Sequence, residues 1–254
     1  REGIDLGIFL GIKNEVSIVN INKIINTEEK KIIIDIGANI GSVSLPLANM
    51  FKNSKIVSIE PTIYAYSKLK KNVSLNPSLK SRIKLENSFI SNKNKSVKEV
   101  HSSWNFSDNY KKHKVHLGIL KKTSFKTKKL DQICSKFKKI DFIKIDVDGH
   151  ELDVLKSGKK TIIKHKPVIF IEIEEQYLRD LGTSTQELLE TLFSLDYALY
   201  RIETNYPCDY LCVPNDKASS FENTVLNKLS FKTSKKIFGK SAKVSFAKNT
   251  DQIY

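Results

Sequence analysis

The chain has 254 residues, of which 40% are hydrophobic and 28% are charged, and its net charge is +15 at pH 7. This length can bury the core of one domain or of two small ones, and the chain has no secretory signal and no apolar run near the roughly 18 residues of a membrane-spanning helix. Its three cysteines, Cys134, Cys208 and Cys212, suit neither a disulfide framework nor a zinc site, so we expect a cytoplasmic protein. The first residue is Arg1 instead of Met, and we therefore expect a fragment or an excised domain.

The positive charge is concentrated in two segments. Residues 92–129 carry eleven Lys against two acids, and residues 215–254 carry eight Lys against three acids, which leaves charges of +9 and +5. Such segments attract nucleic acid, acidic glycans or membrane surfaces. However, 39 of the 43 basic residues are Lys, as in A/T-rich coding sequences, whereas a nucleic-acid surface recruits more Arg. We favour compositional bias over polyanion binding.

After a leading segment over residues 1–30, residues 31–36 predict a buried parallel strand. Gly37 and Gly41 follow in a turn that lets the backbone approach a ligand, and a helix is expected over 41–52. The turn does not fit the dinucleotide fingerprint Gly-x-Gly-x-x-Gly, because residue 39 is Asn and residue 42 is not Gly. At the end of the strand, Asp35 is placed to accept hydrogen bonds or to neutralise an ammonium group.

A second strand is predicted over residues 55–60, and a helix follows over 62–76. The strand ends in Glu60, about twenty residues after the glycine turn, where a doubly wound fold binds a ribose diol. A carboxylate suits this role because it accepts hydrogen bonds from both hydroxyls. An acid that only faces solvent is the alternative, and the spacing from the turn favours ribose binding.

The third strand is expected over 82–86, and an insertion follows it. Residues 89–129 contain short alternating runs without a helical stripe, so we expect a basic β-ribbon. Trp104 lies in this insertion. Its side chain can form a platform that stacks on a sugar ring, or it can pack the ribbon onto the domain.

The fourth strand, over 140–146, ends in a cluster of ionisable residues. Asp146, Asp148, His150 and Glu151 fall within six positions, before a helix expected over 150–164. This density predicts an active-site rim at the carboxyl edge of the sheet. These acids, with Glu172, have the oxygen atoms that Mg²⁺ or Ca²⁺ requires, but acid clusters at strand tips also occur without metal. We predict no metal.

The last predicted elements are strands over 167–173, 196–202 and 208–213 and a helix over 184–195. The final two strands have no helix between them and should pair as a hairpin. Residues 31–214 therefore predict an α/β domain with a doubly wound, mostly parallel seven-stranded sheet, the terminal β-hairpin and the β-ribbon insertion. We expect the basic tail over 215–254 to be partly flexible.

Three segments together resemble the FkbM family of S-adenosylmethionine-dependent methyltransferases: residues 34–41, 58–61 and 142–151. The resemblance extends over residues 31–202 and implies a Rossmann-like class I methyltransferase with S-adenosylmethionine as cofactor. The block over 144–151 is the most specific part. It departs from the family at Asp148, where Glu is more usual; the shorter acid keeps the charge but reaches less far.

The resemblance also implies a cofactor site. Asn39 and the backbone amides after Gly37 would hold the methionine portion, with Gly41 completing the turn and Asp35 close to the amino group. Glu60 would bind the ribose hydroxyls. Ser88, after the third strand, lies where the family contacts adenine, and Asp146 would face the cofactor from the tip of the central strand.

An alcohol acceptor needs a general base, because its pKa is far above neutral. Asp146 and His150 are our candidates, and Glu172 is an orienting residue or an alternative base. His150 is equally consistent with an ordinary residue at a helix N-terminus.

The most consistent function is O-methylation of a hydroxyl on a sugar, a glycan or a related natural product. A methyltransferase that acts on RNA or protein is the alternative enzyme, although the chain lacks the Asn/Asp-Pro-Pro-aromatic motif of many amino-methylating enzymes. A catalytically silent binding module with the same fold is a further alternative. The expected partner is a small-molecule or glycan acceptor; nucleic acid is less favoured.

Overall fold

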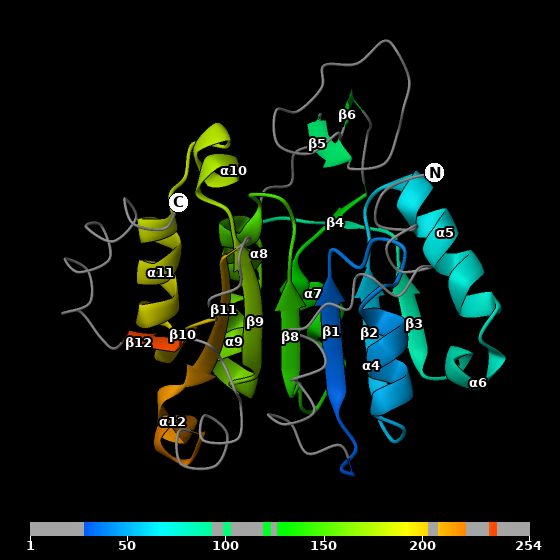
Figure 1. Ribbon diagram of the computed structural model, residues 1–254, viewed down its shortest axis with the longest axis horizontal. Coiled ribbons are helices and arrows are strands. Elements are labelled where there is room, and N and C mark those ends of the chain that lie inside the picture. Colours follow the sequence, from blue (N-terminus) through cyan, green and yellow to red (C-terminus); the bar gives the residue numbers. More distant parts are fainter. Residues whose placement is uncertain are drawn as a thin grey trace. The chain divides into compact units, whose positions relative to one another are not determined.

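The computed structural model describes residues 28–92, 99–102, 119–122, 126–202, 208–221 and 234–237. The described residues belong to two compact units, one up to Lys128 and one from Lys129 onward. Figure 1 shows the helices and strands of both units along the chain. Residues 1–27, Trp104 and most of the tail after 221 lie outside the described residues, so the predictions for them stay predictions.

The first unit contains a parallel sheet in the order β1-β2-β3. Its strands are β1 (Ile32–Ile36), β2 (Lys55–Ile59) and β3 (Ile83–Glu86). In β1 and β2 nearly every residue is buried. This burial explains why both strands are continuous apolar runs instead of alternating ones.

Three helices follow the strands of this unit: α4 (Ser44–Met50), α5 (Ile63–Ser74) and α6 (Pro77–Lys80). The buried face of α5 is a stripe of Ala65, Leu69 and Val73, as helical spacing requires. Helix α4 begins later than predicted because residues 37–43 form the turn. Helix α6 was not predicted; it begins at Pro77, whose fixed φ suits the first helical position.

The described parts of the insertion contain short strands. β4 (Phe89–Ile90) pairs in parallel with β7 (Thr127–Lys128). β5 (Glu99–Ser102) pairs antiparallel with β6 (Ile119–Lys122).

The second unit contains a mixed sheet in the order β8-β9-β11-β10-β12. β8 (Phe142–Ile145) and β9 (Val168–Ile173) are parallel. β11 (Cys208–Pro214) lies antiparallel between β9 and β10 (Tyr197–Ile202), and β12 (Ser234–Ile237) pairs with the other side of β10. β12 was not predicted.

The helices of the second unit are α7 (Leu130–Cys134), α8 (Glu151–Ser157), α9 (Lys159–His165), α10 (Glu175–Asp180), α11 (Thr185–Ser194) and α12 (Asn215–Phe221). The single helix predicted over 150–164 is two helices that meet at Gly158. A Cβ atom there would lie 2.5 Å from Leu130 Cδ2, so any larger residue would require the side chain of Leu130 on α7 to shift. None of the described helices is long and apolar enough to cross a membrane.

Candidate functional site

The turn after β1 is built from residues with left-handed backbone conformations. Gly37, Asn39 and Gly41 have φ angles of 80°, 48° and 93°. The main-chain N–H groups of Gly37 and Ala38 both donate to the Ile59 carbonyl at 3.0 Å, which ties this turn to the end of β2. Asn39 Oδ1 is buried and has no hydrogen-bond partner in the described structure. It can therefore accept a hydrogen bond from a ligand.

Helix α5 packs directly against this turn. A Cβ atom on Gly41 would lie 2.8 Å from Leu69 Cδ1, and Asn72 Nδ2 donates to the Ile40 carbonyl at 2.8 Å. Gly41 is thus favoured by its positive φ, and a larger residue would also require the Leu69 side chain on α5 to shift. The role predicted for it in holding a ligand stays a prediction.

Asp35 is fully buried at the end of β1. Its Oδ2 accepts a hydrogen bond from Ser44 Oγ at 2.5 Å, and Ser44 Oγ lies 2.7 Å from Ser58 Oγ. The two serines were missed in the sequence. They link the acid at the end of β1 to the start of α4 and to β2.

Glu60 lies beside the glycine turn, and its side chain is almost fully buried. Its Oε2 accepts from the Asn39 N–H at 3.0 Å, and its Oε1 accepts from the Thr62 N–H at 2.9 Å and from Thr62 Oγ1 at 2.5 Å. Asn87, after β3, donates to the carbonyls of Glu60 and Pro61 at 2.8 and 3.0 Å. The ends of β1, β2 and β3 therefore come together at Glu60.

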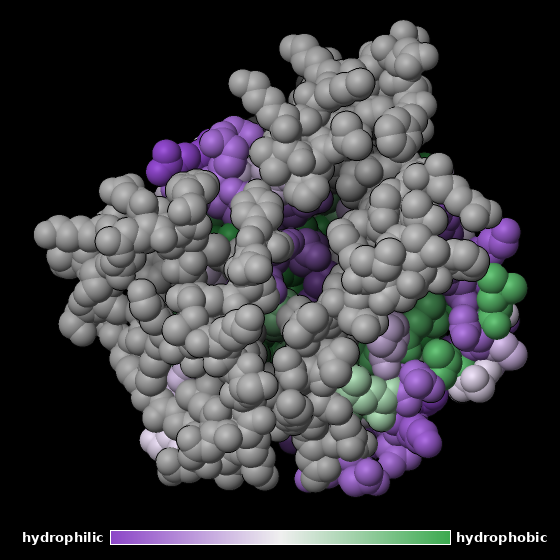
Figure 2. Space-filling model, in the orientation of Figure 1, coloured by the Kyte–Doolittle hydropathy of each residue, from purple (hydrophilic) through white to green (hydrophobic). Residues whose placement is uncertain are grey.

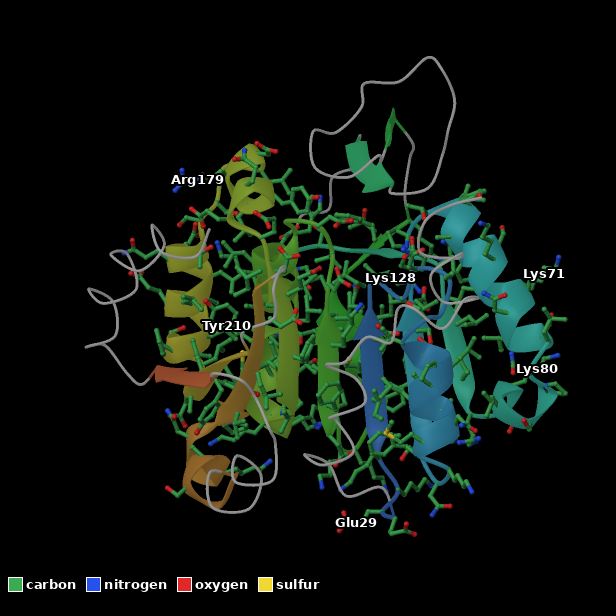
Figure 3. All side chains as sticks on the ribbon, in the orientation of Figure 1. Glu29, Lys71, Lys80, Lys128, Arg179 and Tyr210 are labelled. Carbon is green, nitrogen blue, oxygen red and sulfur yellow. The ribbon has the colours of Figure 1, made fainter. Side chains whose placement is uncertain are left out.

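Ser88 is buried and donates from Oγ to Glu86 Oε1 at 2.5 Å. The same Glu86 oxygen accepts from Lys128 Nζ at 2.7 Å, and Lys128 is labelled in Figure 3. Burial alone would raise the pKa of Glu86, but the hydrogen bonds from Lys128 and Ser88 outweigh burial and hold this pKa below its ordinary value. Ser88 thus belongs to an ionic cluster that the sequence pattern did not reveal.

The second unit places Asp146 at the carboxyl end of β8. Lys144 lies two residues earlier, on the same face of the strand. Lys144 Nζ forms an ion pair with Asp146 Oδ2 at 2.8 Å; the lysine side chain is 5% exposed and the aspartate side chain 35%. A buried cation thus holds a carboxylate that remains open to solvent. The spacing of two residues is the signal that could have identified Lys144.

Glu172, near the end of β9, lies in a group of acids. Burial raises its pKa well above the ordinary value, and the charge of Asp146 and a hydrogen bond with Asp146 raise it further, as do the charges of Asp209 and Asp148. Asp209 on β11 is the cross-strand partner of Glu172. The sequence did not point to Asp209, because its proximity depends on the insertion of β11 beside β9.

The turn between β8 and α8 is organised by Glu151. Its Oε1 accepts from the Val147 and Gly149 N–H groups at 3.2 and 3.1 Å. Burial raises the pKa of Glu151 to about 7, although hydrogen bonds from the backbone act in the opposite direction. His150 is the N-cap residue of α8 and is partly buried. The predicted rim residues are therefore together in one turn.

Helix α10 lies against this turn. Asp148 and Gly149 have positive φ angles of 49° and 97°, and a Cβ atom on Gly149 would lie 2.6 Å from the Tyr177 carbonyl oxygen. Only glycine fits between the turn and α10.

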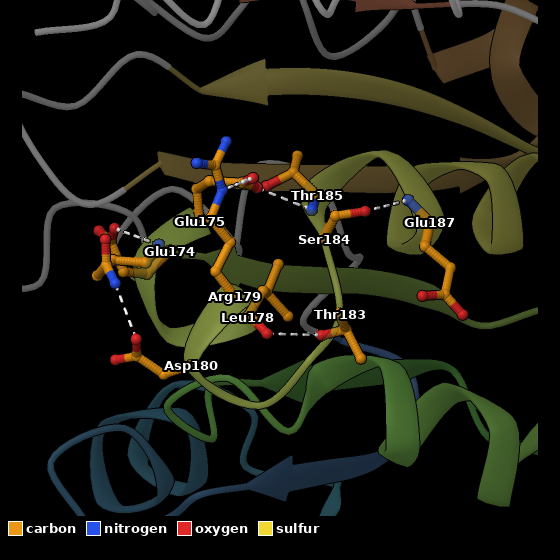
Figure 4. A network of polar contacts seen from close by, with 10 residues as sticks. Glu174, Glu175, Leu178, Arg179, Asp180, Thr183, Ser184, Thr185 and Glu187 are labelled. Carbon is orange, nitrogen blue, oxygen red and sulfur yellow. Dashed lines mark hydrogen bonds and ion pairs between the residues drawn. The ribbon is translucent and has the colours of Figure 1, made fainter.

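Polar contacts fix the position of α10 (Figure 4). Glu175 accepts from Arg179 Nε at 2.7 Å and from the Thr185 N–H at 2.8 Å. Ser184 Oγ accepts from the Glu187 N–H at 3.2 Å, which caps α11. These contacts tie α10 to the start of α11.

The two units thus supply different chemistry. The first offers a glycine turn with a buried amide oxygen beside a carboxylate, and the second offers an aspartate held by a buried lysine. Among the described residues, no group of three His, Cys, Asp or Glu side chains is arranged to hold a metal ion.

Residues 35–199 match the family described as Methyltransferase FkbM domain. The chain is 27% identical over 205 residues to the 2-O-methyltransferase NoeI of Sinorhizobium fredii, a match that covers 73% of this chain and 82% of that protein.

Similar solved structures include the FkbM methyltransferase of Methylobacillus flagellatus, with 22% identity and a TM-score of 0.47 over 73% of this chain and 44% of that chain. The present chain therefore spans less than half the length of that structure. Fibrillarin of Methanococcus jannaschii matches with 13% identity and a TM-score of 0.50 over 80% of this chain and 75% of that chain. This likeness concerns the fold alone, and with the family match it confirms the predicted Rossmann-like α/β class.

Proposed function

Because the chain belongs to the FkbM methyltransferase family, we propose that it transfers a methyl group from S-adenosylmethionine to an oxygen atom of its acceptor. The proposed acceptor is a hydroxyl on a sugar, a glycan or a related natural product. The observation that carries the proposal is the contact of Glu60 with the Asn39 N–H at 3.0 Å, because it places a carboxylate beside the glycine turn, where a doubly wound fold binds a ribose diol.

The residues of the first unit fit the cofactor. Asn39 Oδ1, buried without a partner, would accept from the amino group of the methionine portion, and Glu60 would accept from the ribose hydroxyls. Asp35 is fully buried. It would therefore act on this end of the site through its negative charge and not through direct contact at an exposed surface. Ser88 remains the candidate beside the adenine. When bound, S-adenosylmethionine supplies an already activated methyl group.

The residues of the second unit would manage the acceptor proton. In our proposal the Asp146 carboxylate takes the proton of the acceptor hydroxyl as that oxygen is methylated. The ion pair with Lys144 at 2.8 Å favours the ionised form of Asp146 before it reacts. His150 is the second candidate for this base.

Glu172 suits an orienting role better than that of the base. Because burial and its acidic neighbours raise its pKa, it keeps its proton at a higher pH than an ordinary glutamate and can donate a hydrogen bond to Asp146. This arrangement favours the first of the two roles predicted for it from the sequence.

Oxygen as the acceptor atom is supported by the relative NoeI, which is named a 2-O-methyltransferase. The test is transfer of a labelled methyl group from S-adenosylmethionine to a panel of glycosides, each paired with its 2-deoxy analogue. Transfer to the glycosides that is lost in Asp146→Asn supports the proposal. Transfer only to amines or to RNA would overturn the choice of an oxygen acceptor on a sugar, and no transfer to any class would favour a silent module.

A further inference from the structure

Helix α5 presents an unusual face to solvent. Ile63 at its start and Leu75 at its C-cap are 70% and 68% exposed, and Tyr64 is 37% exposed. These are three of the five large apolar residues that are exposed in the described part of the chain. At 100° per residue, Ile63, Tyr64 and Leu75 fall on the side opposite to the buried stripe of the helix.

The same side of α5 is basic. Lys70 and Lys71 are exposed, and Lys68 lies with its Nζ 4.6 Å from the centre of the Tyr64 ring. Lys80 in α6 is also exposed, and residues 63–80 contain no Asp or Glu. Lys68 and Lys71 are three residues apart, a spacing at which like charges repel. Helix stability therefore does not explain this pattern.

The figures show how these residues are displayed. In Figure 3 the side chain of Lys71 extends outward from α5. In Figure 2 hydrophilic and apolar residues lie side by side on the surface formed by α5 and α6, at the right of the view. The face, which we call the α5 face, comprises Ile63, Tyr64, Lys68, Lys70, Lys71, Leu75 and Lys80.

We propose that the α5 face docks the protein on an anionic lipid surface. Its lysines would bind the headgroups of acidic lipids, and the exposed apolar side chains would enter the boundary between headgroups and acyl chains. Lysine suits this arrangement, because its aliphatic stem lies along apolar surface while its ammonium group reaches the headgroups. The inference rests on α5 and α6 alone and is independent of the proposed reaction.

A nucleic acid is the other polyanion to consider, but this face fits it less well. Residues 63–80 contain no Arg, the residue that favours bidentate contact with phosphate. Two strongly exposed aliphatic side chains also gain little beside a phosphate backbone, whereas a lipid surface buries them. We therefore choose the lipid surface and leave nucleic acid as an outcome of the test.

The test is sedimentation of the full chain with phosphatidylcholine vesicles that contain about one third phosphatidylglycerol, and with pure phosphatidylcholine vesicles. We expect binding to the first only, weakening as salt rises. The double variants Lys70→Gln/Lys71→Gln and Ile63→Ser/Leu75→Ser should each lower the partition coefficient at least fivefold. All four positions are exposed, so thermal unfolding should stay close to that of the parent chain.

Helix α9 offers a matched control. Lys159 and Lys160 are exposed and Ile163 is 54% exposed, so the triple variant Lys159→Gln/Lys160→Gln/Ile163→Ser removes similar groups from another surface. It should change vesicle binding by less than twofold. Equal losses at both helices, or no loss at α5, would overturn the proposal. A chain that binds RNA more tightly than vesicles, and that loses binding with the lysines but not with Ile63 and Leu75, would assign this face to nucleic acid instead.

Discussion

The carboxylate of Glu60 accepts a hydrogen bond at 3.0 Å from the main-chain N–H of Asn39, 21 residues earlier in the chain. This contact fixes the acid at the end of β2 against the turn that follows β1. The same carboxylate also accepts two hydrogen bonds from Thr62, the N-cap residue of α5. One side chain thus sets the geometry of the turn, and in our proposal it also accepts a hydrogen bond from the ribose of the cofactor.

We predict that Glu60→Ala weakens the binding of S-adenosylhomocysteine by about ten- to a hundredfold, as expected for the loss of a charged hydrogen-bond acceptor. Calorimetric titration measures this change. Glu187→Ala, at an exposed position on α11, is the control and should leave the affinity unchanged. Equal affinity of Glu60→Ala and the parent chain would show that the ribose is bound elsewhere.

Gly149→Ala should destabilise the protein by about 2–4 kcal/mol, because the new Cβ atom adds a clash to an unfavourable positive φ. A Cβ atom added to Gly149 would lie 2.6 Å from the Tyr177 carbonyl oxygen, whereas a Cβ atom at Gly182, with a φ of 75°, meets nothing within 4 Å. Gly182→Ala therefore isolates the cost of φ alone, about 1–2 kcal/mol. Urea unfolding of both variants measures the difference, and equal losses would mean that α10 does not press against this turn.

Glu151 predicts a dependence of stability on pH. Below about pH 4.5 the Glu151 carboxyl is protonated in both the folded and the unfolded chain. Between about pH 4.5 and pH 7 the unfolded chain releases this proton and the folded chain keeps it. The free energy of unfolding should therefore fall by up to about 3 kcal/mol as the pH rises through this window.

The variant Glu151→Gln tests this assignment. Its amide oxygen can still accept from the Val147 and Gly149 N–H groups, but it cannot ionise. Urea unfolding at pH 5 and pH 7.5 should show a smaller difference for this variant than for the parent chain. An unchanged difference would assign the pH dependence to other groups, of which Glu172 is the first candidate.

Lys144→Met should lower methyl transfer at neutral pH at least tenfold, because Asp146 loses the buried cation that favours its ionised form. In a plot of the methyl-transfer rate against pH, the fall in rate on the acidic side should move to higher pH. A purely structural defect would not produce this shift. Lys144→Arg should retain part of the activity. The control is Lys156→Met, since Lys156 is exposed and binds Glu187 on the surface; a shift of the profile in the control, or none in Lys144→Met, would contradict the assignment.

The strands and their polar ends could be predicted from local pattern. β1, β2, β8 and β9 are buried apolar runs, and each predicted acid lies where its strand ends. Helix α5 followed from the spacing of its buried stripe. These features depend on residues close in the chain, so the sequence carries them directly.

The features that were missed depend on tertiary contacts. The 150–164 helix divides at Gly158, where Leu130 on α7 approaches, and the proximity of Asp209 to Glu172 follows from the place of β11 in the sheet. The short helices α6, α7, α10 and α12 have too few residues for a periodic pattern. The cluster of Ser88, Glu86 and Lys128 joins β3 to β7, which are far apart in the chain. Spacing along the sequence therefore could not predict it.

The central claim is that the chain binds a methyl-donor cofactor at the turn after β1. Calorimetric titration of the purified chain with S-adenosylhomocysteine, with NADH as the control ligand, tests it most directly. We predict micromolar binding of S-adenosylhomocysteine, on the order of −8 kcal/mol, and no binding of NADH. Binding of NADH, or of neither ligand, would contradict the account.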